Sequence, residues 1–138
     1  MPNGIDLILA DHRNVDALFA AFEKSGDGAI VGQVVDMLKA HDEAERAALY
    51  PMAADVLGDA DTVGALLAAH HAVRGEIAAV SSSEGSALVA AFARLRELVT
   101  EHVADEERGL LAVLQDRATP QQLDELGARL LQAKQRGG

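Results

Sequence analysis

The chain has 138 residues, of which 49% are hydrophobic and only 3% aromatic, and its 22 acidic and 12 basic residues give a net charge of −10. This length suits a single domain, and the negative charge argues against nucleic acid or an anionic membrane as a partner. The absence of cysteine excludes disulfides and thiolate metal ligands. The N-terminus lacks the basic region of a signal peptide, and no apolar run approaches the ~20 residues of a membrane span. We therefore expect a cytoplasmic protein with one domain over residues 1–138.

Apolar residues recur with helical spacing along most of the chain, and no segment alternates as a strand does. The pattern predicts four long helices and a short fifth one, over residues of about 5–23, 29–50, 63–80, 86–116 and 120–135. The second helix should stop or kink at Tyr50, because Pro51 disfavours helical geometry there. A cap at Thr119, followed by Pro120 and by Gln122 three residues on, marks the start of the fifth helix. Short connections predict an all-α fold, an antiparallel up-down four-helix bundle over about 5–116.

Four histidines occupy positions that the periodicity assigns to the core, each near the middle of its helix: His12, His41, His70 and His102. In an up-down bundle such positions meet at one level. A single histidine on an apolar face is more often a hydrogen-bonded core residue than a metal ligand. Four at one level predict a cluster of imidazoles.

The stretches that carry His41 and His102 share the pattern His-x-x-x-Glu, which adds Glu45 and Glu106 on the same helix faces. Each pattern has a further histidine on the helix before it, so the chain contains an internal repeat. Two halves of this kind can dock around a pseudo-twofold axis. We then expect four imidazoles and two carboxylates to point at one another.

Burial of these polar groups without a partner would be costly. Two metal ions remove that cost, because each carboxylate can bridge both ions while two histidines serve each one. Imidazole and carboxylate ligands without thiolate suit iron, manganese or zinc. The sequence therefore predicts a two-metal site.

The same pattern resembles the hemerythrin-like, or HHE cation-binding, domain family, above all in residues 11–15 and 41–51, and the likeness extends over about 5–116. The resemblance implies a four-helix bundle with a non-haem diiron site, bridged by two carboxylates and an oxo or hydroxo group. The ligands that it implies are His12, His41, Glu45, His70, His102 and Glu106.

Oxygen-carrying members of that family have a fifth ligand histidine, four residues after the one that corresponds to His70, where this chain has Arg74. They also have an aspartate five residues after the histidine of the fourth helix. Glu107 stands there, but Glu106 fits the repeat and the helix face better. One iron would then hold water or a further group, which argues against simple reversible oxygen carriage.

Two residues are candidates to fill the gap or to transfer protons. His71 lies about 100° around the helix from His70, and a surface histidine is the simpler interpretation. Tyr50 is nine residues past His41, about on the opposite side of an ideal helix, although Pro51 weakens that objection. A phenolate ligand or a proton donor is possible, and a buried capping ring is the simpler interpretation.

Other residues around the site carry simpler expectations. Asp42, Glu43, Asp105 and Glu107 are expected on a solvated face. The site should be surrounded by an apolar and narrow core that admits diatomic molecules and peroxide but excludes large organic substrates, formed by Val15, Leu38, Val73 and Val99.

Three functions follow from this site. The first is redox catalysis on a small molecule, most simply catalase-like breakdown of hydrogen peroxide, or reduction of nitric oxide. The second is reversible oxygen binding, or sensing of oxygen, iron or nitric oxide, without turnover. The third is a metal-stabilised bundle that serves as an interaction partner. A chain of 138 residues leaves no room for a fused regulatory domain, which disfavours a fused sensor, and no residue pattern indicates a protein partner.

Overall fold

The structure, a computed structural model, describes residues 3–137, and helices joined by short turns are the only regular secondary structure in that range. The elements are α1 (Gly4–Ser25), α2 (Gly28–Ala44), the π-helical turn η1 (Glu45–Leu49), α3 (Tyr50–Leu57), α4 (Ala60–Ser81), α5 (Gly85–Glu106), the π-helical turn η2 (Glu107–Leu111), α6 (Ala112–Arg117) and α7 (Pro120–Gly137). Within the described range, no helix combines the length and the apolar character needed to cross a membrane.

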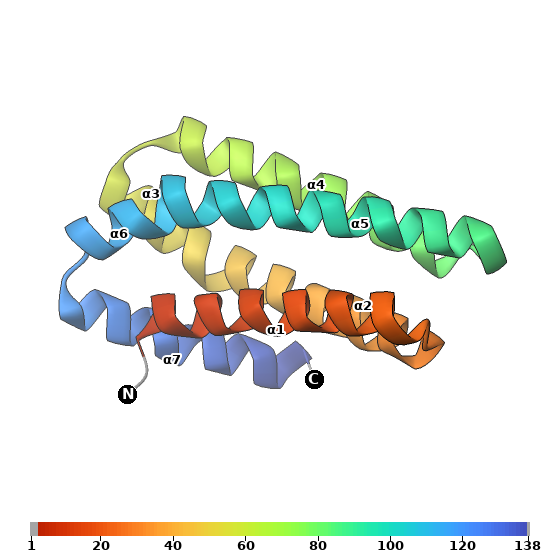
Figure 1. Cartoon of the computed structure of the whole chain (residues 1–138). Helices are drawn as coiled ribbons and strands as arrows, with labels where there is room; N and C mark the ends of the chain where they lie inside the picture. The colour runs from red at the N-terminus through yellow and green to blue at the C-terminus, as the bar shows by residue number, and fades with distance from the viewer. Residues whose placement is uncertain (1–2, 138) are drawn as a thin grey trace.

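The long helices form two pairs (Figure 1). α1 lies along α2, α4 lies along α5, and α7 covers the outer side of α1 and α2. Contacts within each pair are far more numerous than contacts between the pairs. The seam between the α1/α2 pair and the α4/α5 pair is therefore the place where the packing leaves room for a site.

Local sequence sets the ends of these helices. The side chain of Asn3 accepts a hydrogen bond from Ile5 N–H at the start of α1, and Gly26, with φ +67°, ends that helix in the left-handed conformation that glycine tolerates. Before α7, Thr119 and Gln122 exchange side-chain to backbone hydrogen bonds of 2.9 and 3.1 Å, the capping box that the sequence predicts. The fifth helix thus begins where expected.

The second long helix differs from its expected course. It does not stop at Tyr50, but passes through η1 and continues as α3 to Leu57. The Tyr50 N–H bonds to the carbonyl of Glu45, five residues back, and the N–H of Ala112 bonds in the same way to Glu107 in η2. Such π-turns are rare and are frequent at functional sites. Here η1 begins at the glutamate of the first His-x-x-x-Glu pattern, and η2 begins directly after the glutamate of the second.

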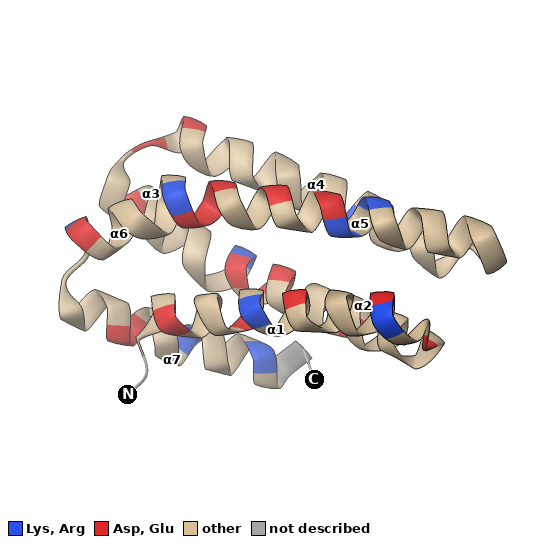
Figure 2. Ribbon diagram, in the orientation of Figure 1, with Lys and Arg blue, Asp and Glu red and all other residues tan. Residues whose placement is uncertain are grey.

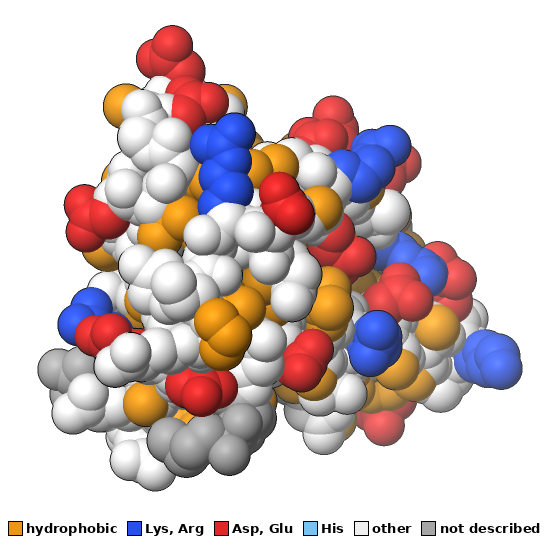
Figure 3. Space-filling model, turned by 90° about the vertical axis from the view of Figure 1, so that its left-hand side faces the viewer, with side chains coloured by type: hydrophobic (Ala, Val, Ile, Leu, Met, Phe, Trp, Pro, Cys, Tyr) orange, Lys and Arg blue, Asp and Glu red, His pale blue; other side chains and the backbone are white. Residues whose placement is uncertain are grey.

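Two apolar clusters lie on either side of the histidine level. One combines α3, α6 and α7 with the start of α1, and includes the fully buried Leu49, Leu110, Leu114 and Leu126. The other, toward the α1–α2 and α4–α5 turns, contains Phe19, Phe92 and several valines. Figure 3 views the molecule from the α3/α6 end, and among the described residues no imidazole is visible there. The first cluster therefore closes that side of the histidine level.

Candidate metal centre

Each of the four long helices contributes one imidazole to a common level, from His12 on α1, His41 on α2, His70 on α4 and His102 on α5. Glu45 and Glu106, both fully buried, lie between them. Their ligand atoms form two groups, within each of which all atoms lie within 4.8 Å of one another. We call His12 and His41 with the two glutamates the first half-site, and His70 and His102 with the same glutamates the second half-site. Both glutamates belong to both groups.

The distances show how the glutamates connect the halves. The Nε2–carboxylate separations within the His-x-x-x-Glu pairs are 3.1 Å for His41–Glu45 and 3.0 Å for His102–Glu106. Across the seam they are 2.9 Å for His70–Glu45 and 3.3 Å for His12–Glu106. Each carboxylate therefore faces imidazoles from both pairs of helices, as a bridging ligand must.

The buried polar atoms at this level lack the partners that buried groups normally have. No hydrogen bond of acceptable geometry reaches His12 Nε2, His41 Nε2, either nitrogen of His102, either oxygen of Glu45, or Glu106 Oε1. Cations satisfy such a set of lone pairs, and its nitrogen and oxygen donors suit iron, manganese or zinc. The donor set therefore fits two metal ions, one in each half-site.

Three of the four imidazoles have a carboxylate on the nitrogen that faces away from the centre. His41 Nδ1 lies 3.0 Å from Asp11, His12 Nδ1 lies 2.7 Å from Glu107, and His70 Nδ1 lies 2.5 Å from Asp42. Such partners fix the orientation of a metal-binding histidine and raise its basicity. His102 Nδ1 has no such partner.

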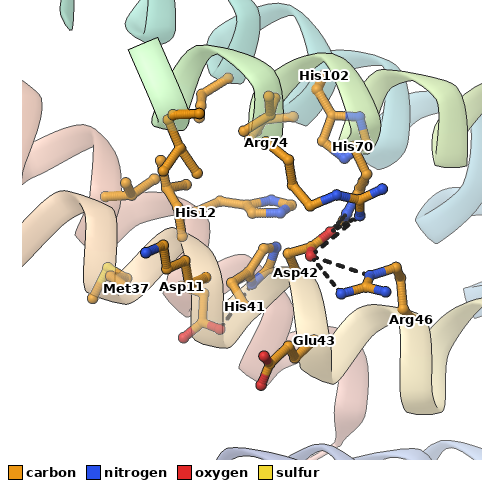
Figure 4. A pocket seen from close by; sticks show the side chains of 18 of the residues that line it. Asp11, His12, Met37, His41, Asp42, Glu43, Arg46, His70, Arg74 and His102 are labelled. Atoms are coloured by element: carbon orange, nitrogen blue, oxygen red, sulfur yellow. Dashed lines mark hydrogen bonds and ion pairs between the residues drawn. The ribbon is translucent and has the colours of Figure 1, made fainter. Parts of the chain in front are cut away.

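The expected solvated position of Asp42 is wrong, and that of Glu107 is only partly confirmed. Asp42 is buried and Glu107 is only partly exposed, whereas Glu43 and Asp105 are exposed as expected. Helix phase alone pointed these two side chains outward, because it does not reveal that a histidine of another helix lies beside them. Arg74 also contributes to this network (Figure 4), because its guanidinium donates a hydrogen bond of 3.2 Å to Asp42.

Tyr50 is 3% exposed and lies at the centre of the histidine level. Its hydroxyl donates to Glu106 Oε2 at 2.6 Å and lies 2.8 Å from His70 Nε2. An ideal helix would rotate Tyr50 by about 180° from His41, but the extra residue of the π-turn η1 reduces this to about 80°. Helix phase therefore does not keep Tyr50 away from the site. The residue pattern around Tyr50 does not predict the π-turn that brings it there.

His71 behaves differently from its neighbour. Its side chain is exposed, and its Nδ1 lies 3.5 Å from a guanidinium nitrogen of Arg74. It belongs to neither half-site.

The carboxylates control protonation at this level. Burial alone lowers the pKa of His41 and of His70, but the neighbouring carboxylates outweigh it and raise each pKa to about 10. Burial tends to raise the pKa of Glu106, but its contacts with the buried cluster, three histidines among them, hold it well below its usual value. Burial and the charges of Glu45 and Glu106 raise the pKa of Tyr50, so its hydroxyl stays protonated.

A pocket of about 540 Å³ opens beside the centre, on the side away from α3, α6 and α7. Val15, Leu38, Val73 and Val99 all line it, so the expected apolar surroundings are present. The expected narrowness is wrong. The two helix pairs stand far enough apart here to leave a cavity that reaches the imidazoles.

Comparisons with known proteins agree with this geometry. The family profile "Hemerythrin HHE cation binding domain" matches residues 3–130. A DNA nickase of Nostoc sp. is 29% identical over 135 residues, which cover 94% of this chain and 38% of the nickase. The crystal structure of a hemerythrin HHE cation-binding domain-containing protein, the Rv2633c homolog from Mycobacterium kansasii, superposes with a TM-score of 0.85 at 15% identity, covering 99% of this chain and 88% of that one. The chain therefore belongs to the hemerythrin HHE cation-binding domain family.

Proposed function

We propose that this domain holds two iron ions, one in each half-site, and breaks hydrogen peroxide down to water and oxygen. The observation that supports this best is that both glutamates belong to both ligand groups, so that each can bridge two ions. The four long helices would act as one antiparallel up-down bundle around the ions. Manganese and zinc are the alternative metals for the same donors.

Bound iron would supply the redox change and the Lewis acidity for the reaction 2 H2O2 → 2 H2O + O2. The four histidines and two glutamates would hold the ions. The Tyr50 hydroxyl holds a proton at Oη, within hydrogen-bonding distance of both Glu106 and His70. It is therefore placed to give a proton to a nearby oxygen and to take it back in the same cycle.

The surroundings support reaction with a small neutral molecule. The cluster that includes Leu49 and Leu110 closes one side of the level, and the pocket opens the other. Peroxide can thus approach the imidazoles through the pocket. His71 lies outside this path, and we assign it no proton-transfer role.

The Nostoc relative raises DNA cleavage as a second candidate. The chain spans 38% of that protein and carries a net charge of −10, which disfavours contact with phosphates. In the view of Figure 2, the basic segments are scattered among acidic ones and form no stripe. We propose that this domain does not itself bind DNA.

Oxygen evolution from peroxide by iron-loaded protein tests the proposed activity. We expect a rate well above that of the same amount of free iron, a large loss in Tyr50→Phe at unchanged iron content, and an unchanged rate in His71→Ala. A stable oxygen adduct after reduction, with no oxygen evolution from peroxide, would replace this proposal by reversible oxygen binding or sensing.

A further inference from the structure

We propose that Arg74, together with Arg46, is a positioning residue of the second half-site, and that it acts on His70 through the carboxylate of Asp42. His70 and Arg74 lie one turn apart on α4, and both contact Asp42 of α2 across the seam (Figure 4). The inference rests on the metal centre of the proposed function, because it concerns residues that hold one of its ligands. It does not depend on the reaction that the metal performs.

The two oxygens of Asp42 are held mainly by different arginines. Oδ1 lies 2.5 Å from His70 Nδ1 and accepts a hydrogen bond of 3.2 Å from Arg74, which reaches Oδ2 less closely, at 3.4 Å. Oδ2 accepts a hydrogen bond of 3.1 Å from Nε of Arg46, and a second nitrogen of that guanidinium lies 2.9 Å away. A turn of the carboxylate plane would therefore break at least one of these contacts.

The orientation of Asp42 matters because of the direction in which His70 points. His70 Nδ1 faces Asp42, whereas its Nε2 lies 2.9 Å from Glu45 inside the centre. When Nε2 binds a metal ion, Nδ1 carries the hydrogen and Asp42 accepts it. A carboxylate that is held in one plane keeps the ring turned so that Nε2 faces the ion. The arginines thus act on this ligand through Asp42.

Arg74 also links the two helix pairs, between which contacts are few. Two contacts from successive turns of α4 to one carboxylate of α2 restrict the rotation of α4 about its axis. That rotation decides that His70, and not the adjacent His71, faces the centre. The position of the ligand therefore depends on this contact as well as on the apolar packing of α4.

The simpler interpretation is an ion pair at the surface without influence on the metal. The side chains of Arg46 and Arg74 are 43% and 40% exposed, and ion pairs of such exposure contribute little to stability. Asp42, however, is buried and shares Oδ1 between Arg74 and a metal-binding ring. The expected effect is therefore on the orientation of His70 and not on the stability of the fold.

His12 offers a comparison within the same molecule. Its Nδ1 lies 2.7 Å from Glu107, whose side chain is 38% exposed. Among the residues that the structure describes, no lysine or arginine forms an ion pair with Glu107. We therefore expect the Nδ1 hydrogen bond of His70 to be held more firmly than that of His12.

The test uses zinc-loaded protein, in which NMR of 15N-labelled histidine follows both Nδ1 hydrogens. In the wild type, the hydrogen on His70 should exchange with water more slowly than that on His12. Arg74→Met should speed the exchange at His70 only, and should weaken zinc binding in the second half-site about two- to fivefold, measured by competition with a chelator. Loss of a positive charge near the ions would by itself strengthen binding, so a weaker second half-site reports lost orientation.

Two further variants frame this result. Arg46→Met combined with Arg74→Met should exceed the effect of Arg74→Met alone, because neither oxygen of Asp42 then keeps its arginine. Arg94→Met is the matched control, since Arg94 forms an ion pair of 3.0 Å with Glu76 within the same helix pair. It should match the wild type in both measurements.

A double-mutant cycle tests whether Arg74 acts through Asp42. Arg74→Met added to Asp42→Ala should cause no further loss of zinc affinity, whereas an independent effect would add to it. If Asp42→Ala does not fold, the exchange at His70 and His12 in Arg74→Met decides alone.

Three results would overturn the positioning role: additive losses in the cycle, equal weakening of both half-sites, and wild-type behaviour of Arg74→Met. When the wild type binds two zinc ions, each of these results leaves the metal centre intact. A wild type that binds no zinc would overturn the positioning role and the metal centre together.

Discussion

The two half-sites use the same ligand types but differ in the carboxylates that hydrogen-bond to the ligand histidines. In the first half-site, Asp11, which directly precedes His12, accepts a hydrogen bond from His41 Nδ1. In the second, the residue directly before His70 is Ala69, and His102 Nδ1 has no acceptor. Supporting carboxylates typically change metal affinity by about 10–100-fold. The internal repeat thus preserves the ligands while leaving the second half-site less supported.

A second difference lies nine residues after the histidine of each His-x-x-x-Glu pattern. Tyr50 follows His41 at this spacing and reaches His70 and Glu106. Leu111 follows His102 at the same spacing and is an apolar core residue. The second half-site therefore has a phenol and a less supported histidine, whereas the first has neither. We infer that the first half-site serves mainly to hold metal and the second to react.

Removal of a metal ligand should have the largest effect on metal content and thermal stability. His70→Ala deletes a ligand of the second half-site and removes an imidazole that contacts both Asp42 and Glu45, so we expect metal content to fall by half or more and thermal stability to fall with it. The adjacent His71→Ala is the matched control, because it removes an exposed imidazole. Elemental analysis and thermal unfolding check both. The reverse outcome would mean that the ligand assignment on α4 is wrong by one position.

Removal of a supporting carboxylate should have a moderate effect. We expect Asp11→Asn to weaken metal binding in the first half-site by about 10–100-fold, measured by competition with a chelator of known affinity. Asp11 is also paired with Lys134 of α7. Lys134→Met is therefore the control, and if it weakened binding as strongly as Asp11→Asn, the effect would come from the anchoring of α7 and not from His41.

Adding the missing carboxylate should have a smaller effect in the opposite direction. Ala69 occupies the position that Asp11 has in the first half, so Ala69→Asp can offer an acceptor to His102 Nδ1. We expect the more easily removed metal ion to become up to about tenfold harder to extract. Ala69→Leu, which adds bulk without an acceptor, should give no gain. Equal extraction rates in wild type and Ala69→Asp would contradict the claim that the missing acceptor for His102 weakens metal binding in the second half-site.

The affinity for metal should rise with pH. The pKa values of His41 and His70 are raised to about 10 in the metal-free site, so both rings carry a proton at pH 7 that metal must displace. We expect release of about two protons per chain on zinc binding, and affinity that rises with pH up to about 10. For the metal-free fold the sign is opposite, because stability from these protonated rings is present below about pH 6.5 and is lost toward pH 10. Calorimetry in buffers of different ionisation enthalpy checks the proton count, and zinc binding without proton release would contradict it.

Much of the fold could be predicted because helical periodicity is a local property of the sequence. The spacing of apolar residues gave the long helices, and Thr119 with Gln122 gave the start of α7. The convergence of the histidines followed from the internal repeat. These features need only the geometry of one helix and the rule that its apolar face is buried.

The remaining features depend on neighbours that no single helix specifies. Asp42 and Glu107 contact histidines of other helices, so the burial of Asp42 and the contact made by Glu107 could not be read from their own helix faces. The contact made by Tyr50 needs the π-turn η1, and the pocket needs the spacing between two helix pairs. Tertiary packing decides each of these.

The most direct test of the central claim is the number of metal ions in the wild-type protein. Purified protein from iron-rich medium should contain about two iron ions per chain by elemental analysis, and a chelator should remove them in two resolved steps, the first of which Ala69→Asp delays. One ion per chain, or none, would contradict the two-metal centre held between Glu45 and Glu106.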